Sequence, residues 1–202
     1  MTPHKGPATS EMVQAWWRVF CSDSPSDGYP TSLAFQYPFK SAVDEVMLLF
    51  PLDGYYLTKK HHAALQDALS AIDEPMFYVS TYEGEGKFLD SPDVRGDAVH
   101  YTVNRDDPYE TYQQAVPWPL ENALYSSSGN WGLMVSHEMH GVLGGSKRFI
   151  EVFKSSYQLW RADVAALKYY WHENPNRGWL DNLLPRIEDG LELEPAEHPE
   201  DD

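Results

Sequence analysis

Residues 126–153 read SSSGNWGLMVSHEMHGVLGGSKRFIEVF. The turn-forming residues 127–130 separate two apolar runs, 120–125 and 131–137, which is typical of a β-hairpin. Strand side chains alternate between faces, so alternate residues from Trp131 to residue 137 share one face. The quoted stretch therefore predicts a hairpin as the centre of the fold.

Downstream of the hairpin, we expect Gly144 and Gly145 to reverse the chain and Ser146 to cap a helix. Apolar side chains then recur at three- and four-residue spacing as far as Trp171, and Pro175 is the first residue to interrupt them. This spacing predicts one long C-terminal helix.

The upstream sequence adds further elements to the hairpin. Ser10 is the expected cap of a helix that buries Val13, Trp16, Trp17 and Phe20, and we expect an irregular segment over 106–119. Other expected elements are a helix over 58–72, capped by Thr58, and strands over 46–50, 76–82 and 99–103. This order predicts an α+β fold, with a mostly antiparallel sheet packed by helices against one face.

Composition divides the chain into three parts. Residues 1–9 contain little to bury and are expected to be disordered, whereas 10–187 suit one α+β domain. Residues 188–202 carry eight acidic and no basic side chains, so we expect an acidic tail. The single cysteine, Cys21, excludes an intrachain disulfide and is expected in the core; it fits a cytoplasmic protein.

The formal net charge is −16, from 31 acidic and 15 basic residues. Direct nucleic-acid binding is disfavoured, because contacts to phosphates require clustered Lys and Arg. An anionic membrane surface is disfavoured for the same reason, and no apolar run has membrane-spanning length. The charge instead favours a basic partner.

His137, Glu138 and His140 invite comparison with the H-E-x-x-H zinc motif. One residue is missing between the two histidines, and in a strand they face opposite sides. A metal site also needs a third ligand, for which the candidates are His100, His61 and Glu121. We expect hydrogen-bonded or surface histidines here, and a solvated pair at His61 and His62.

An acidic, aromatic segment supplies the partner-binding candidates. Seven carboxylates lie between residues 73 and 97, interleaved with aromatic rings, and such surfaces steer a basic protein and then anchor it. The candidate residues are Tyr78, Tyr82, Glu83, Glu85, Phe88, Asp90 and Asp93.

The stretch ALYSSSGNWGLMVSHEMHGVLGGSKRFIEVF resembles a pattern found in small bacterial proteins, some of which are encoded as immunity proteins beside polymorphic toxins. The resemblance covers approximately residues 120–155. It implies a bacterial protein with an immunity role, and it carries over no active-site residue.

Three functions follow from these patterns. The first is a non-enzymatic, cofactor-free binding protein that neutralises a basic toxin or nuclease. The second is a metal-dependent hydrolase that uses His137, Glu138 and His140. The third is an acidic nucleic-acid mimic that inhibits a DNA-binding defence enzyme.

Overall fold

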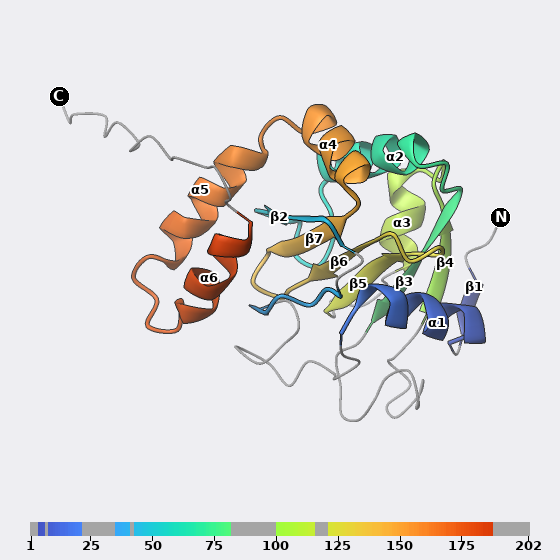
Figure 1. The fold of residues 1–202 in the computed structure, drawn as a ribbon. Helices are drawn as coiled ribbons and strands as arrows, with labels where there is room; N and C mark the ends of the chain where they lie inside the picture. Colours follow the sequence, from blue (N-terminus) through green and yellow to red (C-terminus); the bar gives the residue numbers. More distant parts are fainter. Residues whose placement is uncertain are drawn as a thin grey trace.

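The computed structural model is built around one antiparallel sheet with helices on both faces (Figure 1). It describes residues 4–6, 8–21, 35–40, 43–81, 100–115 and 121–187. Within these residues the sheet has seven strands in the order β1-β4-β3-β5-β6-β7-β2, and all neighbours are antiparallel. The strands are β1 (His4–Gly6), β2 (Glu45–Leu49), β3 (Met76–Thr81), β4 (His100–Asn104), β5 (Asn122–Ser126), β6 (Trp131–Val135) and β7 (Gly141–Gly145).

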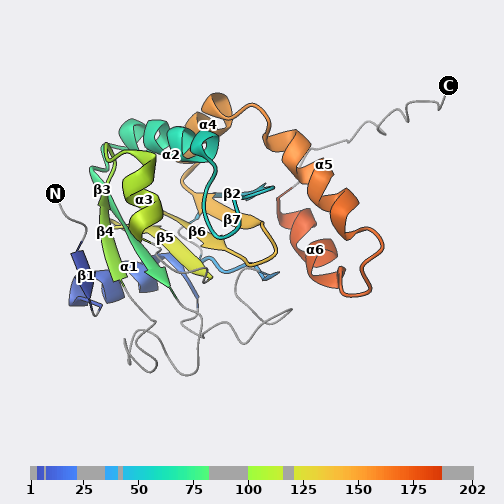
Figure 2. The ribbon, with the colours of Figure 1, turned by 180° about the vertical axis from the view of Figure 1, so that it is seen from behind.

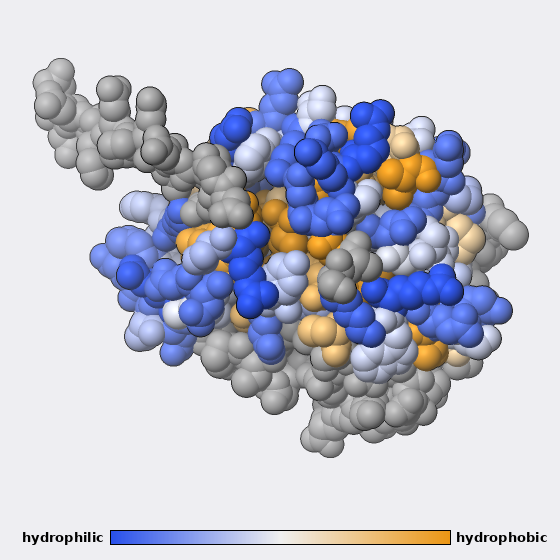
Figure 3. Space-filling model, viewed as in Figure 1, coloured by the Kyte–Doolittle hydropathy of each residue, from blue (hydrophilic) through white to orange (hydrophobic). Residues whose placement is uncertain are grey.

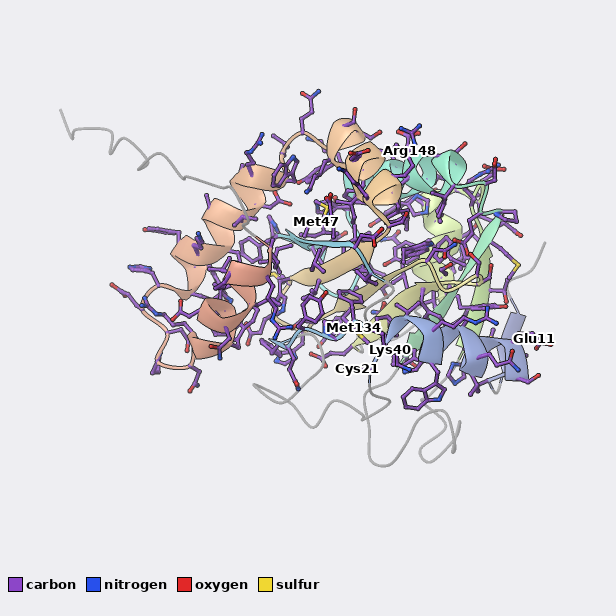
Figure 4. The ribbon with its side chains drawn as sticks, in the orientation of Figure 1. Glu11, Cys21, Lys40, Met47, Met134 and Arg148 are labelled. Carbon is purple, nitrogen blue, oxygen red and sulfur yellow. The ribbon has the colours of Figure 1, made fainter. Side chains whose placement is uncertain are left out.

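The hairpin predicted from the quoted stretch is confirmed as β5 and β6, with Leu124 opposite Leu133. Trp131, Leu133 and Val135 enter one core, whereas Met134 enters the core on the other face. Met47 of β2 lies in the same core as Trp131, and Figure 4 labels it together with Met134. The sheet is therefore apolar on both faces, as its two helical layers require.

Helices cover the two faces in separate sets, which differs from the single covered face that we predicted. α2, α3 and α4 contribute to one core, and α1, α5 and α6 contribute to the other (Figures 1 and 2). The helices are α1 (Ser10–Val19), α2 (Lys59–Ala71), α3 (Tyr109–Ala115), α4 (Lys147–Ser156), α5 (Trp160–Trp171), α6 (Gly178–Leu183) and the short 3-10 helix η2 (Leu184–Arg186).

Two helix caps match the sequence prediction. Thr58 accepts a hydrogen bond from the backbone N–H of His61, and Ser146 accepts one from Phe149. The predicted cap of α1 was one residue late, because Thr9 rather than Ser10 accepts from the backbone of this helix.

β7 replaces the glycine reversal that we predicted between β6 and α4. Its five residues pair with β6 on one side and with β2 on the other. A Cβ atom on Gly144 would lie 2.7 Å from the Phe39 ring and 2.8 Å from Val43. The glycines of β7 thus provide room for close packing across the sheet.

The expected long C-terminal helix is two helices, α4 and α5, separated at Tyr157. The Tyr157 backbone is non-helical, with φ −119 and ψ 81 degrees, and its hydroxyl donates to Asp163 over 3.0 Å. Two other segments also differ from prediction: residues 4–6 form β1, and α3 lies within the segment expected to be irregular.

Burial corrects several single-residue predictions. Trp17 is 37% exposed and Cys21 is exposed at the end of α1, close to Lys40 in Figure 4. His61 and His62, expected in solvent, are both buried, because α2 packs against α4 and against the α3 tyrosines.

The surface in Figure 3 is mainly hydrophilic, with apolar side chains gathered between the α5–α6 pair and α4. None of the helices in the described ranges has the length and hydrophobicity needed to cross a membrane. The predicted acidic tail, 188–202, lies outside the described residues.

Candidate functional site

The partner-binding candidates are mostly beyond the described residues. Tyr78 is the exception, and it is only 8% exposed, in β3 with its ring 5.5 Å from that of Tyr125. Tyr78 is therefore a core residue rather than the exposed anchor that we predicted. The others, which lie outside the described part of the chain, are Tyr82, Glu83, Glu85, Phe88, Asp90 and Asp93.

His137 lies in the turn between β6 and β7 and is held by a buried carboxylate. One oxygen of Glu121 lies 2.6 Å from His137 Nδ1 and accepts from the His137 backbone N–H over 3.2 Å. The Glu121 side chain is 1% exposed and that of His137 is 32% exposed. On the other side of the ring, Glu138 lies 3.7 Å from Nε2. The imidazole is thus oriented by Glu121 and keeps part of its surface in solvent.

His140 ends the same turn but contacts a different set of residues. Its ring is buried, stacks on Trp179 at a centroid distance of 4.7 Å and meets the edge of Phe35 at 4.9 Å. The turn therefore does bring the two histidines near one aromatic ring, since Phe35 also lies 5.7 Å from His137.

The other proposed metal ligands lie in separate networks. His61 bonds Asp163, and His100 bonds Ser80 over 2.7 Å within the sheet. Across the described residues, no group of three His, Cys, Asp or Glu side chains is arranged to hold a metal ion. Glu121, also among our candidates, lies 2.6 Å from His137 Nδ1 and orients its ring.

Glu74 forms a second buried carboxylate network, at the other end of the hairpin. It accepts from Ser126 Oγ at 2.7 Å, from Ser127 Oγ at 2.9 Å and from Trp131 Nε1 at 3.0 Å. Hydrogen bonds of this kind satisfy a buried charge without a counter-ion. The serines of the quoted stretch thus have a structural role, which is to bind the turn that precedes β3.

Asp163 forms a third network, where α5 meets the sheet. It accepts from the backbone N–H of Phe50 at 3.1 Å, from Tyr157 Oη at 3.0 Å and from His61 Nε2 at 3.4 Å. Burial, together with the neighbouring Asp163 charge, raises the pKa of Tyr157. This network connects α2 and α5 with the residue that follows β2, and it holds the Tyr157 side chain where α4 ends.

An open cleft lies beside α6, and its walls include Phe35 and Trp179, the two rings that contact His140. Its volume is about 530 Å³, within the range of ligand sites. We call it the α6 cleft. Its apolar walls are Phe35, Tyr37, Trp179 and Leu183. Its polar side chains are Gln36, Asn176, Asn182 and Arg186.

Aromatic contacts fix the walls of the α6 cleft. Phe35 and Trp179 meet edge to face at 5.1 Å, and Trp179 meets Trp171 of α5 at 5.3 Å. The Arg186 guanidinium lies 4.7 Å from the centre of the Tyr37 ring, a cation–π distance. We did not foresee this site, because its two segments are well over one hundred residues apart.

A second cleft, of about 370 Å³, lies on another side of α6 and is lined by Lys168, Trp171, His172 and Arg177 among others. Unlike the α6 cleft, it contains an acidic residue, Asp181, which pairs with Arg177 at 3.4 Å. α6 is therefore bordered by two clefts that differ in the polar side chains lining them.

Comparisons with known proteins add no family to this description. No protein-family model matches the chain, and neither the curated proteins nor the solved structures include a match.

Proposed function

We propose that this chain is a non-enzymatic, acidic binding protein of the bacterial cytoplasm that neutralises a basic protein partner, such as a toxin or nuclease. The observation that carries the proposal is the formal net charge of −16. A field of this sign accelerates encounter with a basic protein and repels nucleic acid.

Exposed aromatic side chains on α5 support the same proposal. Tyr169 is 77% exposed and Tyr170 is 51% exposed, and Leu159 precedes the helix with 49% exposure. Tyrosine is enriched among the residues that dominate binding energy at interfaces. α5 therefore offers anchors that the buried Tyr78 does not.

The buried ionisable groups also fit a binding protein. Glu74 and Asp163 each accept hydrogen bonds from at least three donors within the domain. Such groups stabilise the fold, and their oxygens are already engaged. Charge is thus available to a partner mainly on the exposed surface.

One observation favours a second candidate, a hydrolase. Glu121 lies 2.6 Å from His137 Nδ1. A carboxylate on one ring nitrogen orients the imidazole, so that the other nitrogen can bind a metal or act in catalysis. Metal analysis of the purified protein separates the candidates. Stoichiometric zinc, manganese or iron, lost in His137→Ala, supports the hydrolase; its absence together with a protein complex supports the binder.

The test of the main proposal is purification of the tagged full chain from its native host at low salt. We expect a basic protein to co-purify, its toxic or nuclease activity to be lost on adding the chain, and the Kd to rise at least tenfold between low and physiological salt. A nucleic-acid mimic differs in that its partner is a DNA-binding defence enzyme rather than a toxin. No complex, or one insensitive to salt, contradicts the proposal.

A further inference from the structure

The α6 cleft differs in charge from the chain as a whole. Among the described residues that line it, Arg186 is the one ionisable side chain of either sign apart from the tyrosine, and there is no carboxylate. The chain carries 31 acidic residues, whereas the one charged side chain among the described residues lining this cleft is basic.

Trp179 and Arg186 are two lining residues with N–H donors on large side chains. Trp179 is 7% exposed, and its indole N–H has no hydrogen-bond partner among the described residues. Arg186 is exposed and contacts the face of Tyr37, an arrangement that leaves its N–H groups able to form a bidentate pair with a carboxylate. The cleft thus combines aromatic walls with the exposed donors of Arg186.

We propose that the α6 cleft is the anchor site for the protein partner, and that it takes an aromatic or aliphatic side chain flanked by a carboxylate. The inference rests on the proposed function. Phe35, Tyr37 and Trp179 provide apolar contact area for the side chain, and Arg186 pairs with the neighbouring acid. A cationic anchor is disfavoured, because the described lining residues include an arginine and no carboxylate.

The open shape of the cleft favours a protein segment over a free small molecule. Gln36, Asn176, Asn182 and Arg186 are all exposed and form its rim. Amide side chains both donate and accept, which suits the alternating groups of a peptide backbone lying across the rim. In this scheme the acidic surface increases the rate of encounter, and the cleft determines which segment remains bound.

The experiment compares two charge reversals in the full chain. Arg186→Glu changes the cleft. The control, Arg148→Glu, makes the same change in net charge at an exposed residue of α4, which Figure 4 labels. We expect both variants to associate with the purified partner at a similar rate. We expect the Kd of Arg186→Glu for that partner to be about tenfold or more higher than the Kd of Arg148→Glu. Equal affinities overturn the cleft proposal, whereas no complex with the wild-type chain overturns the proposed function.

A second measurement requires no partner. The probe is acetyl-Phe-Glu-Phe-Glu-amide, compared with acetyl-Phe-Lys-Phe-Lys-amide, and the readout is the indole ¹H–¹⁵N resonance of Trp179, assigned with Trp179→Phe. We expect a saturable shift with the glutamate peptide, with Kd near or below about 1 mM, and none with the lysine peptide or in Arg186→Glu. No shift, or equal shifts with both peptides, contradicts the proposal.

The full chain also provides a control for its own acidic segment. If removal of residues 188–202 alone shifts the Trp179 resonance and strengthens binding of the glutamate peptide, the cleft belongs to that segment, and the partner proposal is wrong. An unchanged resonance and unchanged peptide affinity support an external partner.

Discussion

Replacing Glu74 with glutamine tests how the quoted stretch holds the fold together. Glu74 is 3% exposed, and its hydrogen-bond donors are neutral groups of residues 126–131. Glutamine keeps the shape but converts one acceptor oxygen into an NH₂ donor. That group then faces Trp131 Nε1 or a serine hydroxyl, and at least one donor loses its acceptor.

Hydrogen bonds to a charged acceptor contribute about 1.5–3 kcal/mol each, and a buried donor without a partner costs about 1–3 kcal/mol. We therefore expect Glu74→Gln to lower the free energy of unfolding by about 2–4 kcal/mol. For a chain of this length, that corresponds to a fall in Tm of roughly 4–16 °C. The loss is a large part of the stability of an ordinary domain, which is about 5–15 kcal/mol.

The assay is urea unfolding followed by circular dichroism, in a double-mutant cycle with Trp131→Phe. Phenylalanine keeps a ring to stack on Phe149, now at 5.2 Å, and removes the indole donor. We expect a coupling energy of about 1–2 kcal/mol. Glu110→Gln is the control, because Glu110 is exposed and its pair with Lys59 contributes little. A Glu74→Gln effect no larger than the control, or strict additivity in the cycle, would refute the reasoning.

Further predictions concern the other networks and close contacts. Asp163→Asn should lower stability by about 2 kcal/mol and speed hydrogen exchange in α5; unchanged exchange contradicts the network. Gly132→Ala places a Cβ 2.5 Å from an α1 side chain and should cost about 1–3 kcal/mol in urea unfolding, whereas Gly178→Ala, in open space, should not destabilise. Burial holds the pKa of His62 below its usual 6.5. The unfolded chain then binds more protons in acid, stability falls below about pH 6.5, and His62→Phe should reduce that fall. Burial raises the pKa of Tyr101 to about 12. Stability should therefore fall as pH rises past about 10, where the unfolded tyrosine ionises, and Tyr101→Phe should reduce this loss in alkaline urea titrations.

Features set by neighbouring residues could be predicted from the sequence. Thr58 and Ser146 cap α2 and α4 because each side chain reaches a backbone N–H three residues later. The hairpin was predictable for a similar reason, since period-two alternation and a serine–glycine turn are visible within one segment.

Features set by distant residues could not be predicted in this way. The glycines of β7 look like a chain reversal until Phe39 and Val43 are seen packed on Gly144. The break between α4 and α5 is equally hidden, because apolar spacing continues through it. At the break, Tyr157 donates to Asp163, which also accepts from the backbone of the distant Phe50.

The turn between β6 and β7, which carries His137 and His140, combines features that the sequence predicts with features that it does not. It also links the quoted stretch to the α6 cleft. Its residue types suggested chemistry, but the spacing did not reveal that Glu121 holds His137 or that His140 stacks on Trp179. Trp179 in turn lines the α6 cleft. Because a stacked ring restricts its partner, His140 positions one wall of the cleft. If the cleft anchors a partner, the turn contributes to recognition through the aromatic wall that it supports, and a substitution at His140 should alter affinity through the orientation of Trp179.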